Sequence, residues 1–437
     1  MTTFGRLIYE LNLTLQAPPS PTADTVARRL ADGAAEEARA AGADLVRRTP
    51  VLTSRSLGEA VGGRIVLKAE NLQRTGSFKL RGALSRLAHL TAQERRAGVV
   101  AGSAGNHAQA LAFAARARGV PCEVFMPAMA SVNKVAAVEA YGGAVRLGGD
   151  SVDDCVAHAR ERAGDTGAAF VHPFDDEHVI AGQATLGLEL VEDVSDLATV
   201  IVPIGGGGLA SGIAATVRAA KPDARIVGVQ ARACAPVACA LRGGDSAVRP
   251  TIADGIAIKR PGGLTLPLLE RWLDDVCTVE EDDLAEAIVL MLERAKLVVE
   301  GAGAVGVAAL LSGAVKPAEH GATVVVLSGG NIDSGLLAEV TRRHETAEGR
   351  RLLLFTRVSD RPGGLAALLN CVAEAGGNLV SVEHVREAVS LHVAQTGVEL
   401  TLETRSAEHG RRLVAALRDA GYGVETLAAP QVPVTYN

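Results

Sequence analysis

The sequence contains few aromatic residues. Phenylalanine, tyrosine and tryptophan together make up 3% of its 437 residues, and tryptophan occurs once. Because proteins that stack nucleic-acid bases need several aromatic side chains, no such platform is expected. An excess of positive charge is also lacking, since the formal net charge is −6. We therefore expect neither nucleic acid nor an anionic membrane surface as a partner.

Closely spaced cysteines are absent as well. The six cysteines are scattered and form no CxxC pair (Cys122, Cys155, Cys234, Cys239, Cys277 and Cys371). A disulfide framework or a zinc site is therefore not expected, and a reducing compartment fits better.

The sequence also lacks the marks of secretion and membrane insertion. Arg6 and Glu10 interrupt the N-terminal segment MTTFGRLIYELNLTLQ, so we expect no signal peptide. The longest apolar stretch begins at Val298 but contains Glu300 and several glycines, which is typical of a buried core helix. We expect a cytoplasmic protein.

A chain of this length predicts two or three domains. Residues 1–25 end in the patch APPSPTADT and form an expected leader, followed by an Ala-rich helix over Ala23–Ala43. From Arg64 to about Ser334, short apolar runs alternate with helical segments, which predicts mostly parallel sheets with helices on both faces. We assign this α/β region to residues 26–345, with a smaller lobe of about 82–180 inserted in a larger one.

The pattern changes near Arg350. The remaining segments follow the order βαββαβ, which is that of a ferredoxin-like α+β sandwich, and we assign residues 349–437 to it. The segment TRRHETAEG before it is polar and is expected to be the linker. Its first predicted helix carries apolar residues at helical spacing (Leu365, Leu368, Leu369 and Val372).

The segment TGSFKLRGA, Thr75–Ala83, carries the strongest chemical signal. It places Lys79 among small residues and one aromatic, Phe78, early in the α/β region. A buried lysine has a lowered pKa, and its neutral amine can form an imine with a carbonyl cofactor. A lysine on an exposed turn is the plain structural alternative.

A second segment, SAGNHAQA from Ser103 to Ala110, follows an apolar run and opens a helix. Backbone N–H groups at a helix start bind a carboxylate or phosphate, and Asn106 can bond a neutral oxygen there. The alternative is an ordinary helix start capped by Ser103.

A third segment, PIGGGGLASG from Pro203 to Gly212, places four glycines between an apolar run and a helix. The glycines allow close approach of the backbone to a phosphate. The next predicted strand ends in Gln230, where a dinucleotide-binding protein has an acidic residue, so a lone phosphate is favoured over NAD. A fourth segment, VVVLSGGN, places Ser328 where an apolar run ends and where ligands of parallel sheets gather.

In this order, the four segments resemble the fold-type II pyridoxal-phosphate enzymes of the threonine/serine ammonia-lyase (dehydratase) family. The resemblance extends from about Thr49 to Asn331 and includes ADGIAIKRPG (Ala253–Gly262) and ERAKLVVEGAGA (Glu293–Ala304).

The end of the chain, from about Arg351, resembles an ACT domain, a small-molecule-sensing module. The segments DRPGGLAALL (Asp360–Leu369) and GGNLVSVEH (Gly376–His384) carry this likeness. It implies an amino-acid effector such as isoleucine or valine, or, as the plainer alternative, a purely structural oligomerisation domain. The family also implies a homo-oligomer, a dimer or tetramer.

The resemblance implies roles for individual residues. Lys79 holds pyridoxal phosphate through its amine and, once the substrate has displaced it, takes the α-proton of L-threonine or L-serine. Phe78 packs against the cofactor ring, Asn106 binds its hydroxyl, and Ser328 faces its nitrogen. The phosphate is held by backbone amides (Gly205, Gly206, Gly207, Gly208 and Leu209). The substrate carboxylate is held by the loop of Ser103, Ala104, Gly105, Asn106 and His107.

Two positions depart from relatives of this family. Ala104 stands where serine racemases have a second serine, so we expect weak racemase activity. Gln230 stands where metal-activated relatives have a carboxylate, and a neutral amide is a poor ligand for Mg²⁺ or Ca²⁺, so we expect no metal requirement. His107 is expected to be a packed histidine, and Glu300 either approaches the cofactor ring or caps a helix.

Other functions stay open at this point. They are a serine or hydroxyaspartate dehydratase, a β-replacement enzyme such as a cysteine synthase, an inactive amino-acid sensor and a nucleotide-binding protein. One methyl group changes pocket affinity by only about 1–3 kcal/mol, so the sequence does not separate threonine from serine. A biosynthetic role, in isoleucine synthesis, and a catabolic one both remain open.

Overall fold

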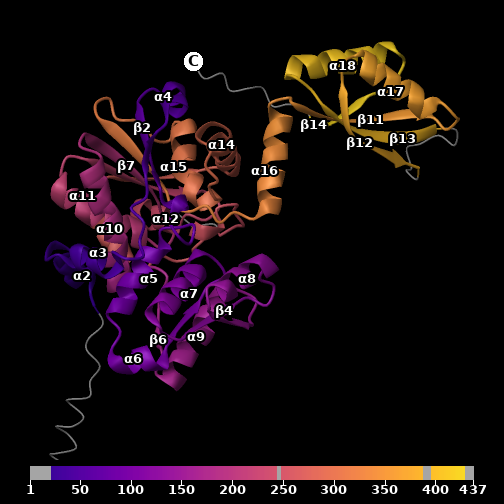
Figure 1. The fold of residues 1–437 in the computed structure, drawn as a ribbon. Coiled ribbons are helices and arrows are strands. Elements are labelled where there is room, and N and C mark those ends of the chain that lie inside the picture. Colours follow the sequence, from indigo (N-terminus) through magenta and orange to yellow (C-terminus); the bar gives the residue numbers. More distant parts are fainter. Residues whose placement is uncertain (1–20, 244–247, 387–394, 429–437) are drawn as a thin grey trace, which may run out of the picture.

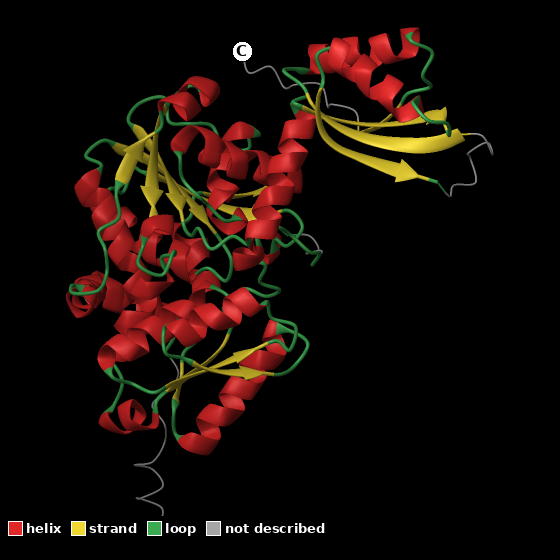
Figure 2. Ribbon diagram, turned by 45° about the vertical axis from the view of Figure 1, so that its right-hand side comes forward, coloured by secondary structure: helices red, strands yellow, loops and turns green. Residues whose placement is uncertain are grey.

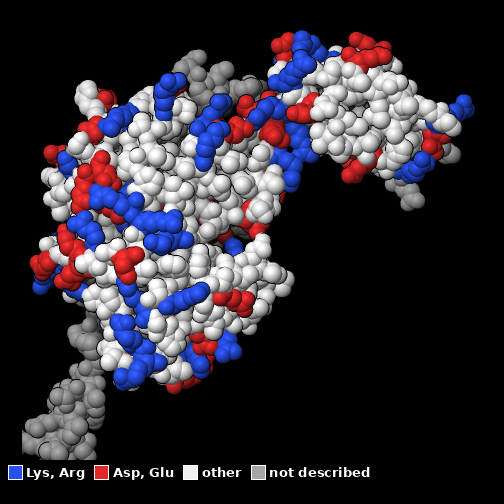
Figure 3. All heavy atoms as spheres, in the orientation of Figure 1, with Lys and Arg blue, Asp and Glu red and all other residues white. Residues whose placement is uncertain are grey.

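The computed structural model describes residues 21–243, 248–386 and 395–428. These residues form a large lobe, a small lobe below it in Figure 1, and a separate C-terminal sandwich. Lysine and arginine are interspersed with aspartate and glutamate over the face drawn in Figure 3. Within the described ranges, no helix is both long and apolar enough to cross a membrane.

The large lobe is built on a six-stranded sheet in the order β1-β2-β10-β7-β8-β9. All neighbouring strands run parallel except β1 and β2, which pair antiparallel. The strands are β1 (Val51–Thr53), β2 (Arg64–Ala69), β7 (Leu197–Pro203), β8 (Arg225–Ala231), β9 (Asp275–Val279) and β10 (Ala322–Leu327).

Helices cover both faces of this sheet (Figure 2). Side chains of β2 alternate between two cores: Ile65 and Leu67 pack on one face, and Val66 packs on the other. The first face is covered by α4 (Arg55–Val61), α14 (Glu281–Leu290), α15 (Gly301–Leu311) and α16 (Ser334–Ala347). The second is covered by α10 (Glu177–Asp193), α11 (Gly208–Ala220), α12 (Pro236–Arg242) and α13 (Thr265–Trp272). Burial on both faces explains why these strands are continuous apolar runs.

The small lobe contains a parallel four-stranded sheet in the order β5-β4-β3-β6. Its strands are β3 (Val99–Gly102), β4 (Cys122–Met126), β5 (Ala144–Leu147) and β6 (Ala169–Phe170). Its helices are α5 (Lys79–Ala88), α6 (Ala92–Ala97), α7 (Asn106–Arg118), α8 (Val132–Ala140) and α9 (Val152–Thr166). The predicted fold class, parallel sheets with helices on both faces, is confirmed for this region.

The C-terminal sandwich has an antiparallel sheet in the order β12-β13-β11-β14. Its elements follow the predicted order βαββαβ: β11 (Arg351–Ser359), α17 (Gly364–Glu374), β12 (Asn378–Val385), β13 (Gln395–Glu403), α18 (Ala407–Asp419) and β14 (Glu425–Ala428). Both helices lie on one face of the sheet, and their apolar residues, among them Leu368, Val372 and Leu413, form a core with the strands.

The polar segment TRRHETAEG, expected to be the linker, is mostly helical, because α16 continues through it up to Ala347. One expectation about local structure was wrong. The N-terminal helix is not continuous: Gly33 has a φ of 102°, and this left-handed conformation separates α2 (Ala23–Ala31) from α3 (Ala34–Gly42). Residues 1–20 of the expected leader lie outside the described residues.

Candidate active site

Lys79 is the first residue of α5, and the loop before it is fastened to the end of β10. The Phe78 amide donates to the Ser328 carbonyl at 3.1 Å, and Ser77 forms a bridge with Gly329. Gly76 has a φ of 73°, and a Cβ there would stand 2.4 Å from the side-chain oxygen of Asn331. Only glycine fits this turn, which brings the lysine to the edge where the parallel strands end.

Lys79 is half-buried, and a fraction of its amine is neutral. Its Nζ donates a 2.8 Å hydrogen bond to the carbonyl of Pro173 and lies 5.1 Å from the centre of the Phe78 ring. Burial lowers the pKa of Lys79 to about 8, and the attraction of Glu300 offsets this only in part. A substantial neutral fraction at moderate pH makes this amine a nucleophile.

Asn106, the first residue of α7, is held by two partners. Its Nδ2 donates to Glu300 Oε1 at 2.7 Å, and its Oδ1 accepts from Asn331 Nδ2 at 2.6 Å. Glu300 is the buried N-cap residue of α15, but its side chain makes no capping hydrogen bond and binds Asn106 instead. Burial and the charge of Asp254 raise the pKa of Glu300 to about 7, although its hydrogen bond with Asn106 lowers it.

The four glycines form the turn between β7 and α11. A Cβ on Gly206 would stand 2.3 Å from the Phe174 ring, and Gly207 has a φ of 97°. Close packing thus requires glycine and leaves the first amides of α11 at the edge of the sheet, where a helix start attracts phosphate. The Leu209 side chain is buried in the large-lobe core, so only its backbone is available to a ligand.

The remaining predicted positions lie on the same edge of the sheets. Ser328 is buried, and its hydroxyl lies 3.4 Å from the Ala302 carbonyl. Ser103 does not cap α7: the N-cap is Gly105, whose amide donates to the Ser103 hydroxyl at 3.3 Å. Ala104, between them, is half-buried.

His107 is a packed histidine in the structure. It is buried, and its Nε2 lies 2.9 Å from the Val171 carbonyl, which requires a proton on that nitrogen. Burial and the charge of Lys79 lower its pKa to about 3. A neutral histidine with its Nε2 proton engaged is suited to holding the loop in place.

These residues fit a phosphate-bearing carbonyl cofactor. The half-buried Lys79 amine can react with the carbonyl group, and the glycine turn supplies amides for a phosphate. Two hydroxyls in the lysine loop, those of Thr75 and Ser77, are buried without a hydrogen-bond partner. They are therefore free to bind polar atoms of a ligand. Pyridoxal phosphate carries both chemical functions.

The sequence-based interpretation missed the segment that follows β6. The Pro173 carbonyl holds Lys79, Phe174 packs on the glycine turn, and Asp175 accepts from the amides of Gly263 and Leu264 at 2.9 Å each. The signal was available, because HPFDD places polar residues directly after a parallel strand.

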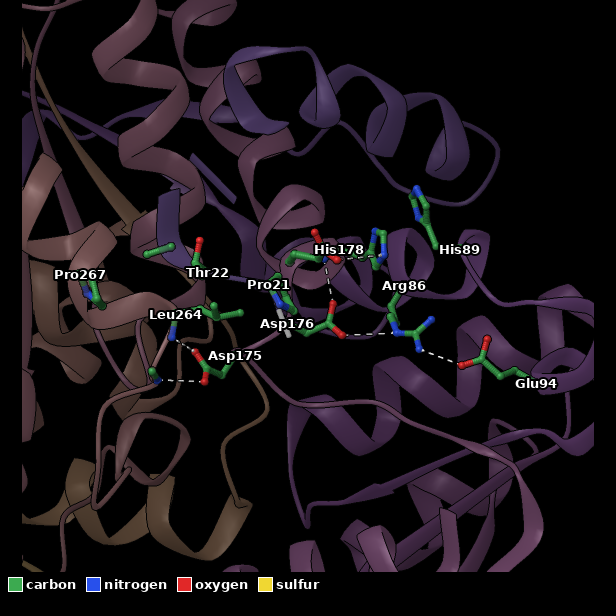
Figure 4. A pocket seen from close by; sticks show the side chains of 13 residues that line it. Pro21, Thr22, Arg86, His89, Glu94, Asp175, Asp176, His178, Leu264 and Pro267 are labelled. Carbon is green, nitrogen blue, oxygen red and sulfur yellow. Dashed lines mark hydrogen bonds and ion pairs between the residues drawn. The ribbon is translucent and has the colours of Figure 1, made fainter. Parts of the chain in front are cut away.

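Beyond Asp175 lies a cavity of about 760 Å³ that Lys79 does not line (Figure 4). Arg86 lies between Asp176, at 3.4 Å, and Glu94, at 3.3 Å, and forms an ion pair with each. His89 and His178 stack with ring centres 3.9 Å apart. This cavity is therefore separate from the site around Lys79.

Gln230 is buried at the end of β8. Its Nε2 donates to the Ile204 carbonyl at 3.2 Å, and its Oε1 accepts from the Ala238 amide at 2.9 Å. Among the described residues, no group of three or more histidine, cysteine, aspartate or glutamate side chains could hold a metal ion.

Comparison with known proteins identifies the family. Residues 43–329 match the model of the pyridoxal-phosphate dependent enzymes. The chain is 44% identical over 385 residues to an L-threonine ammonia-lyase of Thermotoga maritima, covering 87% of this chain and 95% of the relative. It is 46% identical over 388 residues to an L-threonine ammonia-lyase of Geobacter sulfurreducens, covering 87% and 96%.

Solved structures give the same result. The processed form of threonine deaminase isoform 2 from Solanum lycopersicum is 31% identical and superposes with a TM-score of 0.68, covering 74% of this chain and 95% of that one. A maize serine racemase is 36% identical with a TM-score of 0.67, covering 71% and 96%. With a family match over residues 43–329 and relatives aligned over most of its length, the chain belongs to the pyridoxal-phosphate dependent enzymes.

Proposed function

We propose that this protein is a threonine ammonia-lyase that converts L-threonine to 2-oxobutanoate and ammonia, and L-serine to pyruvate and ammonia. The observation that carries the proposal is its identity of 44–46% to two L-threonine ammonia-lyases over almost their whole length. The site around Lys79 is consistent with it, since a half-buried amine of lowered pKa serves both attachment and proton transfer.

In this proposal, four kinds of groups hold the cofactor. Lys79 binds it through Nζ, Phe78 packs against its ring, and Asn106 donates to its hydroxyl. Ser328 lies beside its nitrogen, and the amides of Gly205, Gly206, Gly207, Gly208 and Leu209 bind its phosphate. When bound, pyridoxal phosphate withdraws electrons and stabilises negative charge at the α-carbon of an amino acid.

The chain's own residues carry out positioning and proton transfer. The Ser103–His107 loop binds the substrate carboxylate through its amides and directs the α-hydrogen toward Lys79. The Lys79 Nζ takes that proton, and its ammonium group returns a proton to the departing β-hydroxyl, which leaves as water. Ser328 is neutral and does not protonate the cofactor nitrogen as a carboxylic acid would, which favours loss of the hydroxyl over transamination. The released enamine hydrolyses to the 2-oxo acid and ammonia.

Ala104 separates this function from racemisation. A racemase needs a second acid or base on the face of the substrate opposite the lysine. The methyl group of Ala104 has no proton to give, so we propose that L-serine is eliminated and not converted to D-serine. Detection of D-serine at a rate comparable to pyruvate formation would contradict this assignment.

We further propose that residues 26–345 form the catalytic part, with the small lobe at about 82–180, and that residues 349–437 form an ACT-like regulatory domain. The turn DRPGG is consistent with an amino-acid site, since Gly363 has a φ of 94° and α17 begins directly after it, at Gly364. We propose isoleucine or valine as the effector. We also propose that the protein is cytoplasmic and forms a homo-oligomer. Flat titrations of activity and melting temperature with both amino acids would leave an oligomerisation role for this domain.

The deciding experiment measures 2-oxo acid release from L-threonine and L-serine by the purified, cofactor-loaded protein and by its Lys79→Ala variant. We expect 2-oxobutanoate from the wild type and none from the variant. If neither substrate yields an oxo acid while the wild type still holds the cofactor covalently, the threonine proposal fails and other hydroxy amino acids become the candidates.

A further inference from the structure

The segment Ala253–Gly262, which we call the strap, belongs to the large lobe and is anchored at both ends. The amide of Ile252, just before it, donates to Glu281 Oε2 at 2.9 Å, and the amide of Gly263, just after it, donates to Asp175 Oδ2 at 2.9 Å. Between these anchors the strap has only one turn of helix, at Asp254–Ile256. It is thus a defined structural element with a fixed path.

The strap touches the candidate active site. A Cβ on Gly205 would stand 3.1 Å from the Cα of Ile256, so the strap packs directly on the glycine turn. A Cβ on Gly255 would stand 3.6 Å from Glu300 Oε1 and 3.9 Å from Asn106 Nδ2. The strap therefore lies against both the expected phosphate site and the group that holds Asn106.

Two ion pairs connect the strap to the small lobe. Asp254 pairs with Lys134 of α8 at 3.0 Å, and Lys259 pairs with Asp153 in the first turn of α9 at 2.6 Å. The strap thus presents a negative charge followed by a positive one, and the small lobe presents the opposite signs. A displacement that brought Lys259 toward Lys134 would place like charges together, so the order of charges favours one alignment of the lobes.

The charges of these pairs are partly exposed, with the side chains 34–68% accessible. Such exposed pairs contribute little to stability, too little to hold a fold together. Each lobe has its own hydrophobic core, however, so the pairs need only bias how the lobes meet. Interactions of this strength favour the contact between the two lobes and still allow the lobes to separate again in each catalytic cycle.

We propose that Lys134, Asp153, Asp254 and Lys259 form an electrostatic latch that holds the small lobe, with its Asn106 loop, against the strap, in the arrangement to which an amino acid substrate binds. The pair of Asp254 and Lys134 also acts on the site, because Asp254 raises the pKa of Glu300 and Lys134 lowers it. The latch adds a positioning role to the proposed function and rests on that function only for the identity of the substrate.

The pair of Lys259 and Asp153 gives the cleaner test, because neither residue is among the main contributors to the pKa of Glu300. The variants are Lys259→Asp, Asp153→Lys and the double exchange. The matched control is Arg343→Asp, which breaks a similarly short and exposed pair with Asp282 between α16 and α14, both in the large lobe.

In the cofactor-loaded enzyme, each single reversal is expected to raise the KM for L-threonine about three- to tenfold with a smaller change in kcat, as loss of one exposed pair and gain of one repulsion imply. The double exchange restores KM to within about twofold, and salt at about 0.5 M raises the wild-type KM toward that of the single variants. The control variant leaves KM unchanged. Equal KM values for wild type and single reversals, or no recovery in the exchange, would overturn the latch.

A second measurement needs no activity. Amide hydrogen exchange of residues 253–262 in the cofactor-loaded protein is expected to speed up in each single reversal and to recover in the double exchange. If threonine and serine prove not to be substrates, this readout still decides on the latch, so its failure and that of the proposed function are distinguishable. Unchanged exchange in all variants counts against the latch.

Discussion

The Nζ atom of Lys79 donates a 2.8 Å hydrogen bond to the carbonyl oxygen of Pro173, a neutral partner contributed by the segment after β6. A carboxylate in that place would hold the lysine charged, whereas a carbonyl leaves burial to dominate and lowers the pKa of Lys79 to about 8. Two segments 94 residues apart in the chain thus prepare one amine for nucleophilic attack.

The first prediction concerns the pH at which Lys79 becomes reactive. Because the neutral amine reacts with a carbonyl, the rate of cofactor incorporation into the cofactor-free protein is expected to rise with pH and reach half of its maximum near pH 8. The covalent adduct is followed by its absorbance in stopped-flow mixing, with Lys79→Ala as the blank. A half-maximum above pH 10, as for an ordinary lysine, would contradict the structure.

Glu300 provides a prediction about stability. Its pKa is raised by burial from 4.5 to about 7, so the stability that it contributes is complete below pH 4.5 and is lost as the pH rises through 7. Glu300→Gln removes this titration. The free energy of unfolding of the cofactor-free variant, relative to wild type, is therefore expected to increase by roughly 3 kcal/mol between pH 4.5 and pH 8. Urea unfolding of both proteins at both pH values measures this difference. The same difference between variant and wild type at pH 4.5 and at pH 8 would refute the prediction.

The glycine turn can be tested by adding one methyl group. In Gly206→Ala the new Cβ would stand 2.3 Å from the Phe174 ring, so the turn must shift. We expect a loss of about 1–3 kcal/mol of stability and cofactor binding at least tenfold weaker.

Gly164→Ala in α9 is the matched control, because nothing lies within 4 Å of its added Cβ. That variant is expected to gain about 0.5–1 kcal/mol and to bind the cofactor normally. Fluorescence titration with pyridoxal phosphate and thermal unfolding separate the two results. Normal cofactor binding by Gly206→Ala would remove the glycine turn from the site.

A buried ion cluster next to Lys79 leads to a further prediction. Arg81 pairs with Glu70 at 2.8 Å and with Glu189 at 2.7 Å, all three nearly inaccessible. Arg81→Met leaves Glu70 without its ion-pair partner and Glu189 with Lys68 alone, so it is expected to destabilise the protein by about 3–5 kcal/mol. Arg343→Met, at an exposed pair, is expected to lose at most about 1 kcal/mol. Similar melting temperatures for the two variants would contradict this difference.

Local motifs allowed Lys79, Asn106 and the glycine turn to be singled out before their contacts were known, and the rule that ligands gather at the carboxyl ends of parallel strands did the same for Ser328. Apolar periodicity likewise predicted the sheets and the C-terminal sandwich. Both rules work because they depend on local pattern alone.

Pairings between distant segments could not be predicted in this way. Arg81 and Glu189 are 108 positions apart, and a charged residue in a helix pattern is ordinarily assigned to the surface. The contact of Pro173 with Lys79 uses a backbone carbonyl, which leaves no trace in residue type. Gly33 interrupts a helix that the composition favoured. Its left-handed φ depends on the tertiary structure, and the alanine-rich neighbours do not reveal it.

The last prediction concerns metal ions. Gln230 uses both ends of its amide within the protein: it donates to the Ile204 carbonyl, just before the glycine turn, and accepts from the Ala238 amide. This amide is neutral and already engaged at both ends, which makes it a poor cation ligand, so activity is expected to survive chelation unchanged and to gain nothing from added Mg²⁺ or Ca²⁺.

The matching variants separate charge from hydrogen bonding at this position. Gln230→Met loses both hydrogen bonds and is expected to be destabilised by about 1–3 kcal/mol. Gln230→Glu keeps the shape of the side chain but replaces the donor to the Ile204 carbonyl by a buried negative charge. At pH 8 this variant is therefore expected to lose more stability and more cofactor affinity than Gln230→Met. Stimulation of the wild type by a divalent cation would show that the amide is no barrier to metal binding. Rescue of Gln230→Glu alone by Mg²⁺ would show instead that the glutamine is what abolishes the requirement.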